Sequence, residues 1–344
     1  MIEKYGKSYG DIESFKTDFL TENQLYLDKN AQIADYYLKQ PLRQRCKLCN
    51  ALRDNTEKFF SSHGVSYYIC SKCNHVNGNH LETADFSDFV YQDSNYYDEI
   101  YNEKSKELYT SRVERIYVPK AEWMIECLQA EGLNVGDIHV LDAGAGSGYF
   151  VNALQRCRVD CRGIDISKNQ VDYGNRMNEA EWLTCIPEKD IPQAISESSE
   201  NVISFIGVLE HVMDIDEILQ AVCKNSNIQY IYLSVPTLSY SVALEALTPA
   251  VFNRSLGGGH THLFTEESLQ YMYEKYGWDI LGEWRFGTDI ADFQRTMTVG
   301  LNMSGNHELA NILNEHLSEV LDELQLVIDK SKFCSEIHVL VKKR

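Results

Sequence analysis

The stretch IHVLDAGAGSGYF, residues 138–150, contains the pattern that decides the fold. Its apolar first part is typical of a buried strand, and this strand ends at the acidic residue Asp142. A loop with three glycines follows at 144–148, and an apolar helical pattern begins near Phe150. A chain that passes from a strand through glycines into a helix exposes backbone amides to which a ligand can bind. The stretch therefore predicts a ligand-binding strand–loop–helix unit.

A second strand pattern, CRGIDIS at 161–167, indicates which ligand this is. Its Asp165 follows the loop at a distance that suits hydrogen bonds from a carboxylate to ribose hydroxyls. The loop has the spacing G-x-G-x-G, whereas a dinucleotide site requires G-x-G-x-x-G. The carboxylate of Asp142 would repel a pyrophosphate but suits a cofactor with an ammonium group and no phosphate. S-adenosylmethionine is such a cofactor, and we expect these residues to bind it: Asp142, Gly144, Ala145, Gly146, Asp165 and Ile166.

Three motifs occur in one order, VLDAGAGSG, GIDIS and FIGVLEHV, the last at 205–212. Over roughly residues 131–300 the chain resembles the class I S-adenosylmethionine-dependent methyltransferases. The resemblance implies a doubly wound sheet of seven strands with a last antiparallel pair. It also implies that Gly207, Val208 and Glu210 line the sulfur side of the cofactor. An NAD-binding domain and a non-catalytic cofactor-binding scaffold are the alternatives, but the intact motifs argue against a degenerate site.

The order of the predicted elements supports an α/β fold. From residue 119 onward strands and helices alternate, which is typical of a parallel, doubly wound Rossmann-like sheet. A family of this kind places its ligand at the carboxyl ends of the strands. The predicted strands are 137–142, 161–166, 181–191 with its loop, 202–206, 228–235, 278–287 and 336–343, and the predicted helices are 121–131, 148–157 and 168–178.

We divide the chain into four segments. These are an N-terminal helical segment (1–40), a zinc ribbon (41–82), a helical lid or linker (83–130) and the cofactor-binding domain (131–344). The last contains a helical insertion at about 306–331, whose apolar stripe we expect to pack on the chain's own surface, with a homodimer contact as the alternative. The stripe consists of Leu313, Leu317, Val320, Leu324 and Val327.

Four of the ten cysteines form two C-x-x-C pairs separated by twenty residues, a spacing that predicts a closed, structural Zn²⁺ site. Asn50 and Asn74 follow the pairs, and Asn tolerates the left-handed backbone such turns need. A turn is expected at His63-Gly64. The ribbon could be a stapled fold or a wall of the substrate site. The predicted ligands are Cys46, Cys49, Cys70 and Cys73, with His75 or His80 as alternatives for one of them.

Composition limits the partners. The 344 residues carry 51 Asp and Glu against 32 Lys and Arg, a net charge of −19. Because nucleic-acid binding depends on basic side chains, a nucleic-acid substrate is disfavoured. An RNA base methyltransferase with a zinc segment stays an alternative, although no N/D-P-P-Y-type motif is found. No apolar run approaches the roughly 20 residues that span a membrane, and no signal-peptide core is found, so we expect a cytoplasmic protein.

Three histidines are candidates for the base that a methyl transfer to a hydroxyl or a carbon acid requires. His211 follows a buried strand, and His260 and His262 lie in GGGHTHLFT, 257–265, whose glycines predict a mobile loop. Each could instead have a purely structural hydrogen bond.

The acceptor is expected to be a small molecule. A C-x-x-C segment before this type of core resembles bacterial enzymes that methylate sugars, nucleotide-linked sugars or surface polysaccharides, which implies a carbohydrate-type acceptor. We expect the chain to differ from the larger sugar C-methyltransferases, which have a further C-terminal domain. Secondary candidates for the pocket are Tyr96, Tyr97, Tyr101, Asp289, Asp292, Arg285 and Arg295.

Overall fold

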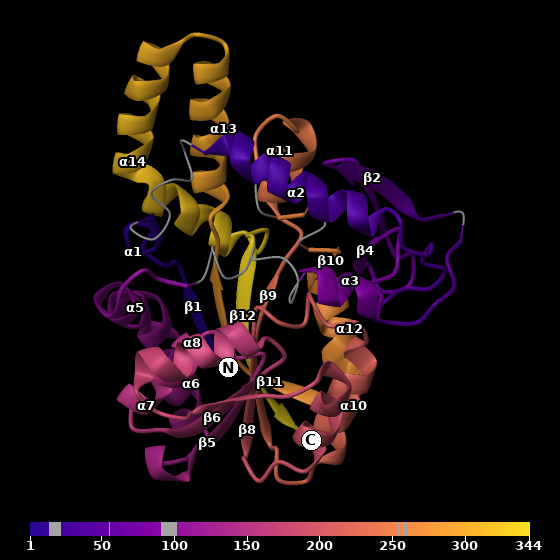
Figure 1. Cartoon of the computed structure of the whole chain (residues 1–344), viewed down its shortest axis with the longest axis vertical. Helices are drawn as coiled ribbons and strands as arrows, with labels where there is room; N and C mark the ends of the chain where they lie inside the picture. The colour runs from indigo at the N-terminus through magenta and orange to yellow at the C-terminus, as the bar shows by residue number, and fades with distance from the viewer. Residues whose placement is uncertain (14–21, 55, 91–101, 253–254, 257–259) are drawn as a thin grey trace.

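The fold is built on one large sheet, as the computed structural model in Figure 1 shows. The structure describes residues 1–13, 22–54, 56–90, 102–252, 255–256 and 260–344. The sheet has eight strands in the order β1-β11-β12-β9-β8-β5-β6-β7. Its strands are β1 (Ile2–Tyr5), β5 (His139–Ala143), β6 (Asp160–Asp165), β7 (Leu183–Cys185), β8 (Val202–Ile206), β9 (Tyr230–Pro236), β11 (Trp278–Phe286) and β12 (Glu336–Lys343).

The strand directions confirm the predicted doubly wound α/β architecture. β5 pairs in parallel with β6 and with β8, and β8 pairs in parallel with β9. β12 lies between β9 and β11 and runs antiparallel to both. One difference lies at the N-terminus, where a helical segment was expected. Residues 2–5 instead form β1, an eighth strand that pairs in parallel with β11 at the edge of the sheet.

Helices cover both faces of the sheet and bury two apolar cores. On one face α6 (Val118–Ala130), α7 (Tyr149–Arg156) and α8 (Lys168–Asn178) contribute buried side chains to one core. On the other face α9 (Ile191–Ser196), α10 (Ile215–Lys224) and α12 (Glu266–Tyr276) contribute to the second. The short helices of this region are α5 (Lys106–Arg112), η3 (Val113–Tyr117), η4 (Val135–Asp137) and η5 (Glu188–Asp190).

A second, antiparallel sheet has the order β10-β4-β3-β2. β2 (Lys58–Ser62) and β3 (Val65–Ile69) form the predicted hairpin, whose turn has positive φ at His63 and Gly64. β4 (Val76–Gly78) follows, and the fourth strand, β10 (His262–Leu263), comes from far along the chain. A third apolar core lies between this sheet and its neighbouring helices. The remaining helices of the region are α2 (Asn23–Tyr37), α3 (Ala84–Asp88) and α11 (Tyr240–Leu247), whereas α1 (Gly10–Glu13) lies beside η3.

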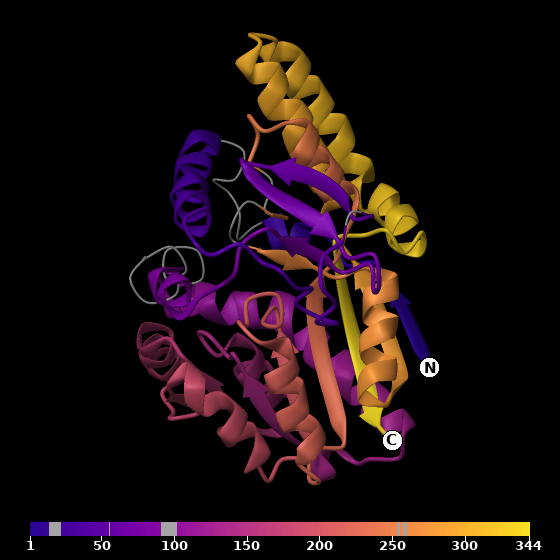
Figure 2. The ribbon, with the colours of Figure 1, turned by 90° about the vertical axis from the view of Figure 1, so that its right-hand side faces the viewer.

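Two long helices, α13 (Asp289–Met303) and α14 (His307–Lys330), form a hairpin that extends beyond the sheet in both views (Figures 1 and 2). The predicted helical insertion is therefore present as α14. Its apolar stripe does not pack as expected, because Val320, Leu324 and Val327 are exposed. The buried face of α14 instead carries Ala310, Leu321, Gln325 and Asp329.

Within the described residues, no helix is both long and apolar enough to cross a lipid bilayer. The division into four segments stays a prediction. The pairing of β4 with β10 joins the proposed zinc ribbon to the proposed cofactor-binding domain and so crosses two of the proposed boundaries.

Candidate active site

The loop after β5 opens its backbone toward a cavity. Gly144, Gly146 and Gly148 have φ values of 78°, 52° and 71°, which are unfavourable for other residues. At Gly144 a Cβ would also lie 2.5 Å from Cγ2 of Val208, so a side chain there would displace the neighbouring strand end. At Gly146, by contrast, no described atom lies within 4 Å of the Cβ position. The loop therefore combines close packing at its base with open space at its tip.

Two carboxylates flank this loop. Asp142 is 2% exposed and accepts a hydrogen bond of 2.6 Å from Oγ of Ser204. Burial raises the pKa of Asp142 to about 7; the bond from Ser204 opposes this shift and nearby Asp165 adds to it. Asp165 accepts hydrogen bonds from the backbone amides of Gly146 (2.7 Å) and Ser167 (2.8 Å), and burial raises its pKa as well. This pair favours a ligand that brings a positive charge and hydroxyl groups.

The loop and the strand ends line a cavity of about 780 Å³. This volume falls within the range of about 300–1,000 Å³ typical of small-molecule sites. Beyond the loop, the cavity is bounded by η5 and the start of α9 and by the turn after β8. All nine residues predicted to contact the cofactor line it, namely Asp142, Gly144, Ala145, Gly146, Asp165, Ile166, Gly207, Val208 and Glu210.

At one end of the cavity Glu210, His211 and His260 come together. One possible ligand atom from each lies within 4.8 Å of the others, and the two imidazole centroids are 5.1 Å apart. Nδ1 of His260 bonds the carbonyl oxygen of Ser255 at 3.1 Å. Glu210 is 3% exposed, its Oε2 has no hydrogen-bond partner among the described residues, and burial raises its pKa to about 8. Two of the three predicted histidines thus meet a buried carboxyl group.

The third histidine, His262, is placed elsewhere. Its side chain is fully buried behind the cavity lining, and its Nδ1 lies 2.9 Å from Nε2 of His75. Burial holds the pKa of His262 well below its ordinary value, with Lys47 adding to the shift, so the ring is neutral. A group in this position can support the strand that carries it but does not face the cavity.

The small sheet holds the backbone that carries His260. The amide of Gly78 donates to the carbonyl of Thr261 at 2.7 Å, and Oη of Tyr67 donates to the carbonyl of His260 at 3.3 Å. A Cβ at Gly78 would overlap Oη of Tyr37 and lie 2.8 Å from the Thr261 oxygen. The ribbon is therefore attached directly to the histidine end of the cavity.

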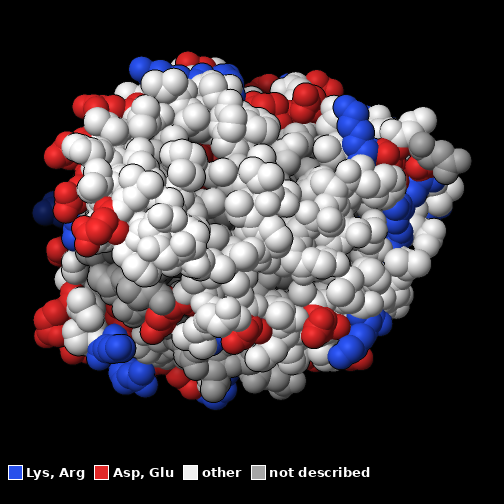
Figure 3. All heavy atoms as spheres, turned by 90° about the horizontal axis from the view of Figure 1, so that it is seen from above, with Lys and Arg blue, Asp and Glu red and all other residues white. Residues whose placement is uncertain are grey.

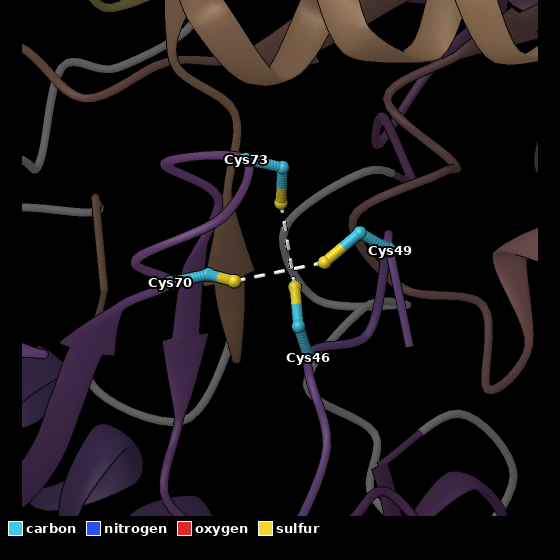
Figure 4. Close-up of side chains that lie close together, drawn as sticks. All are labelled: Cys46, Cys49, Cys70 and Cys73. Atoms are coloured by element: carbon cyan, nitrogen blue, oxygen red, sulfur yellow. Dashed lines mark hydrogen bonds between the residues drawn. The ribbon is translucent and has the colours of Figure 1, made fainter. Parts of the chain in front are cut away.

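The four cysteines of the two C-x-x-C pairs point toward one another (Figure 4). The Sγ atoms of Cys46 and Cys73 are 3.6 Å apart, as are those of Cys49 and Cys70. Tetrahedral Zn²⁺ with Zn–S bonds of about 2.3 Å requires separations of about 3.8 Å, so the donor set fits this ion. The left-handed conformations predicted after each pair are confirmed, with φ of 56° at Asn50 and 57° at Asn74. The alternative ligands His75 and His80 do not belong to this cluster.

A model of a protein family described as a methyltransferase domain matches residues 103–283, more than half of the chain. The chain belongs to this methyltransferase domain family. It is a class I S-adenosylmethionine-dependent methyltransferase. The sequence matches no curated protein.

Among solved structures, magnesium protoporphyrin IX methyltransferase from Synechocystis PCC 6803 with bound SAH is 12% identical and covers 76% of this chain and 100% of its own, with a TM-score of 0.48. A SAM-dependent methyltransferase from Archaeoglobus fulgidus is 18% identical, with coverage of 72% and 98% and a TM-score of 0.41. A putative sarcosine dimethylglycine methyltransferase from Galdieria sulphuraria is 14% identical, with coverage of 66% and 86% and a TM-score of 0.44.

The methyltransferase cavity also contains a charged group that sequence reasoning missed. Lys7, Lys120 and Glu336 reach it from three separate segments. Burial lowers the pKa of Lys7 to about 7, and the charge of Lys120 adds to this effect. Burial alone would raise the pKa of Glu336, but Lys120 and a hydrogen bond from His338 hold it well below its ordinary value. A carboxylate at the start of an apolar strand was the one sequence signal for this group.

The secondary candidates from the sequence have mainly structural contacts. Asp289 accepts hydrogen bonds from the amides of Ser241 and Ser335, whereas Asp292 does line the cavity. Arg285 is buried in an ion pair with Glu266 and does not line the cavity. Arg295 also lies outside the lining and packs over Phe252, and Tyr96, Tyr97 and Tyr101 fall outside the described residues.

Proposed function

We propose that this methyltransferase methylates a small carbohydrate-type acceptor, on a hydroxyl oxygen or an acidic carbon. The observation that carries the proposal is the position of Glu210, His211 and His260 in the cavity that the glycine loop lines. Methyl transfer requires the acceptor atom in line and near contact with the methyl carbon. A hydroxyl or carbon acid must also lose a proton, and these three side chains are our candidates for removing it.

We assign the cofactor to the loop end of the cavity. S-adenosylmethionine supplies an electrophilic methyl group on a sulfonium sulfur when it is bound. Asp142 is positioned to attract its ammonium group, and Asp165 to accept hydrogen bonds from ribose hydroxyls. The absence of a side chain at Gly146 leaves open space beside the loop for the cofactor, whereas Gly144 packs closely against Val208. The same residues would hold the demethylated product.

We assign the acceptor to the part of the cavity beside the cofactor's sulfur, where Glu210, His211 and His260 remove its proton. His262 then has a supporting role, because its bond to His75 fixes the strand that follows His260. This arrangement makes two of the three predicted histidines direct participants. It makes the third a positioning residue.

We also propose that Cys46, Cys49, Cys70 and Cys73 bind structural Zn²⁺. Four thiolates complete the coordination sphere, so this ion would take no part in the chemistry. The pairing of β4 with β10 gives the ribbon a second task as a wall of the acceptor site. The sequence left two roles open for the ribbon, a stapled fold and a wall of the substrate site. The attachment of the ribbon to the backbone at His260 favours the wall.

Charge supports a small acceptor over RNA. The net charge of −19 opposes binding to a polyanion. On the face shown in Figure 3, Lys and Arg form separate small groups near the rim and no continuous basic surface. Together with the C-x-x-C segment, which resembles that of sugar-modifying enzymes, this leads us to a carbohydrate-type acceptor.

The test is a methyl-transfer assay with isotopically labelled S-adenosylmethionine and a panel of nucleotide-linked sugars, free sugars and RNA. We expect label in a sugar fraction and none in RNA. Label in RNA at a rate above that of every sugar would contradict the acceptor class. Tight cofactor binding without turnover on any compound of the panel would favour the scaffold alternative.

A further inference from the structure

The cluster of Glu210, His211 and His260 has the composition of a metal site. It contains two imidazoles and one carboxylate, and one ligand atom from each lies within 4.8 Å of the others. We propose that these three side chains bind one divalent transition-metal ion, which in turn binds an oxygen of the methyl acceptor. This inference rests on the proposed function and specifies it: the three side chains act on the acceptor's proton through the bound ion, and water receives the proton.

The donor set suits such an ion and leaves room for substrate. Imidazole nitrogen and carboxylate oxygen bind ions such as Zn²⁺, Fe²⁺ and Co²⁺ at about 2.0–2.2 Å. Ligand atoms around one ion are then about 3–3.5 Å apart, so the three side chains need a small inward movement from their present separation. Three protein ligands leave at least one coordination position open, as catalytic sites require and the four-cysteine cluster does not provide.

Hydrogen bonding orients the ligands for this task. The carbonyl of Ser255 can only accept, so Nδ1 of His260 carries the hydrogen and Nε2 keeps its lone pair for a metal. Such a bond from the second ring nitrogen to a carbonyl is typical of metal-bound histidine. Ribbon contacts to the carbonyls of His260 and Thr261 fix the backbone on the other side.

The carboxyl group of Glu210 provides the second independent observation. It is 97% buried, faces the cavity, and its Oε2 has no hydrogen-bond partner among the described residues. A buried carboxyl oxygen without a donor is costly unless something else satisfies it. A cation between Glu210 and the two imidazoles would supply the missing partner.

The chemistry balances with water as the proton acceptor. An acceptor hydroxyl that binds the cation through oxygen becomes more acidic, and its O–H bond breaks with transfer of the proton to water. An oxygen lone pair then forms the bond to the methyl carbon while the methyl–sulfur bond breaks and its electrons remain on sulfur. Two neighbouring hydroxyls could occupy two open positions, which would select vicinal diols such as those of sugars.

The experiment is a titration of the 344-residue chain, with its ribbon zinc in place, by Co²⁺ alone. Bound metal is counted by mass spectrometry, and Co²⁺ affinity is measured by calorimetry and visible absorption. Cobalt bound to imidazole and carboxylate lacks the intense thiolate charge-transfer band that cobalt in the ribbon would show. We expect one equivalent without that band, and more than about tenfold weaker binding in Glu210→Gln and His260→Gln.

The matched control is Glu217→Gln, which removes a carboxylate from the cavity lining outside the cluster and should leave Co²⁺ affinity unchanged. Circular dichroism and thermal unfolding test whether each variant is folded, because Glu210 is itself a predicted cofactor contact. If no Co²⁺ binds in addition to the ribbon zinc, or if Co²⁺ binds all variants with the same affinity, the proposed metal site is wrong. A chelator can remove metal from the cluster while the ribbon zinc stays bound. If this protein still methylates its acceptor at the full rate, the cluster acts as a metal-free base, so the metal site is wrong and the proposed function survives. Loss of methyl transfer under every metal condition, with Co²⁺ still bound, would instead count against the proposed function.

Discussion

The two ends of the cavity are assembled in different ways. The cofactor end comes from β5, β6 and the loop between β5 and α7, segments that pair directly as parallel neighbours in the sheet. The acceptor end combines the turn after β8 with His260, and the ribbon holds this backbone because Tyr67 bonds the carbonyl of His260 and Gly78 bonds that of Thr261. The first end is a local motif of the sheet, whereas the second depends on a contact between segments about 180 residues apart in the chain.

This difference implies that the two ends can be damaged separately. The cofactor loop is supported by the sheet and by hydrogen bonds to Asp165. The acceptor end has the ribbon as one of its supports, so we expect changes in the ribbon to lower turnover before they lower cofactor affinity. Four predictions test this separation.

The largest effect is expected from Cys46→Ser. Loss of one thiolate from a four-cysteine zinc site should release the metal and loosen the sheet that pairs with β10. Turnover should fall more than about 100-fold, or about 2.7 kcal/mol, while cofactor affinity changes less than about threefold. Zinc content, steady-state rates and calorimetry measure this, with Cys185→Ser, an exposed cysteine outside the ribbon, as the control. A parallel collapse of cofactor affinity would mean that the ribbon is integral to the whole core.

Asp165→Ala is expected to lower cofactor affinity and to leave the ribbon intact, the reverse of Cys46→Ser. This carboxylate orders the loop through the amides of Gly146 and Ser167 and is the proposed partner of the ribose. Affinity for S-adenosylhomocysteine should fall more than about tenfold, which is about 1.4 kcal/mol, with the ribbon zinc retained. Asp172→Ala is the control, since Asp172 is an exposed carboxylate on α8 that pairs with Lys168. Unchanged affinity in Asp165→Ala would refute the ribose assignment.

The difference between a local motif and a long-range contact also explains which features the sequence predicted. The strand–loop–helix unit, the alternation of strands and helices and the left-handed Asn50 and Asn74 depend on short-range patterns, and each was predicted correctly. β1 was missed because four residues carry too little periodicity to be distinguished from the start of a helix.

The acceptor end was predicted incompletely for a related reason. Spacing alone could not distinguish His260 from His262, because residues two apart on one strand would share a face. The sequence did not show that His260 precedes β10 whereas His262 lies on it and pairs with β4. The Lys7, Lys120 and Glu336 group was missed because its members come together only in the folded chain. Long-range pairing is thus the information that the sequence lacked.

A finer test of the ribbon contact is Gly78→Ala. The added methyl group would overlap Oη of Tyr37 and press on the carbonyl of Thr261. We expect a stability loss of about 1–3 kcal/mol and a roughly tenfold fall in turnover, with zinc and cofactor binding retained. Gly136→Ala is the matched control, because no described atom lies within 4 Å of its Cβ position and its φ is not positive. Full activity in Gly78→Ala, with the expected loss of stability, would show that the ribbon does not position His260.

The smallest effect is a pH dependence of cofactor affinity that comes from the protonation of Asp142. The pKa of Asp142 in the free protein is raised to about 7 by burial, so the carboxylate is mostly protonated below that pH. A cofactor ammonium group binds the ionised form, and its own pKa, about 7.7–8.0 for an α-amino group, keeps it charged up to that range. Affinity for S-adenosylhomocysteine should therefore rise, by about fivefold, between pH 6 and about pH 7.5. Asp142→Asn keeps the oxygen that accepts from Ser204 but removes the titration, so its affinity should be lower at the upper pH and flatter across the range. Lys7 titrates in the same interval, and an unchanged slope in Asp142→Asn would assign the pH dependence to that lysine, which also lines the cavity.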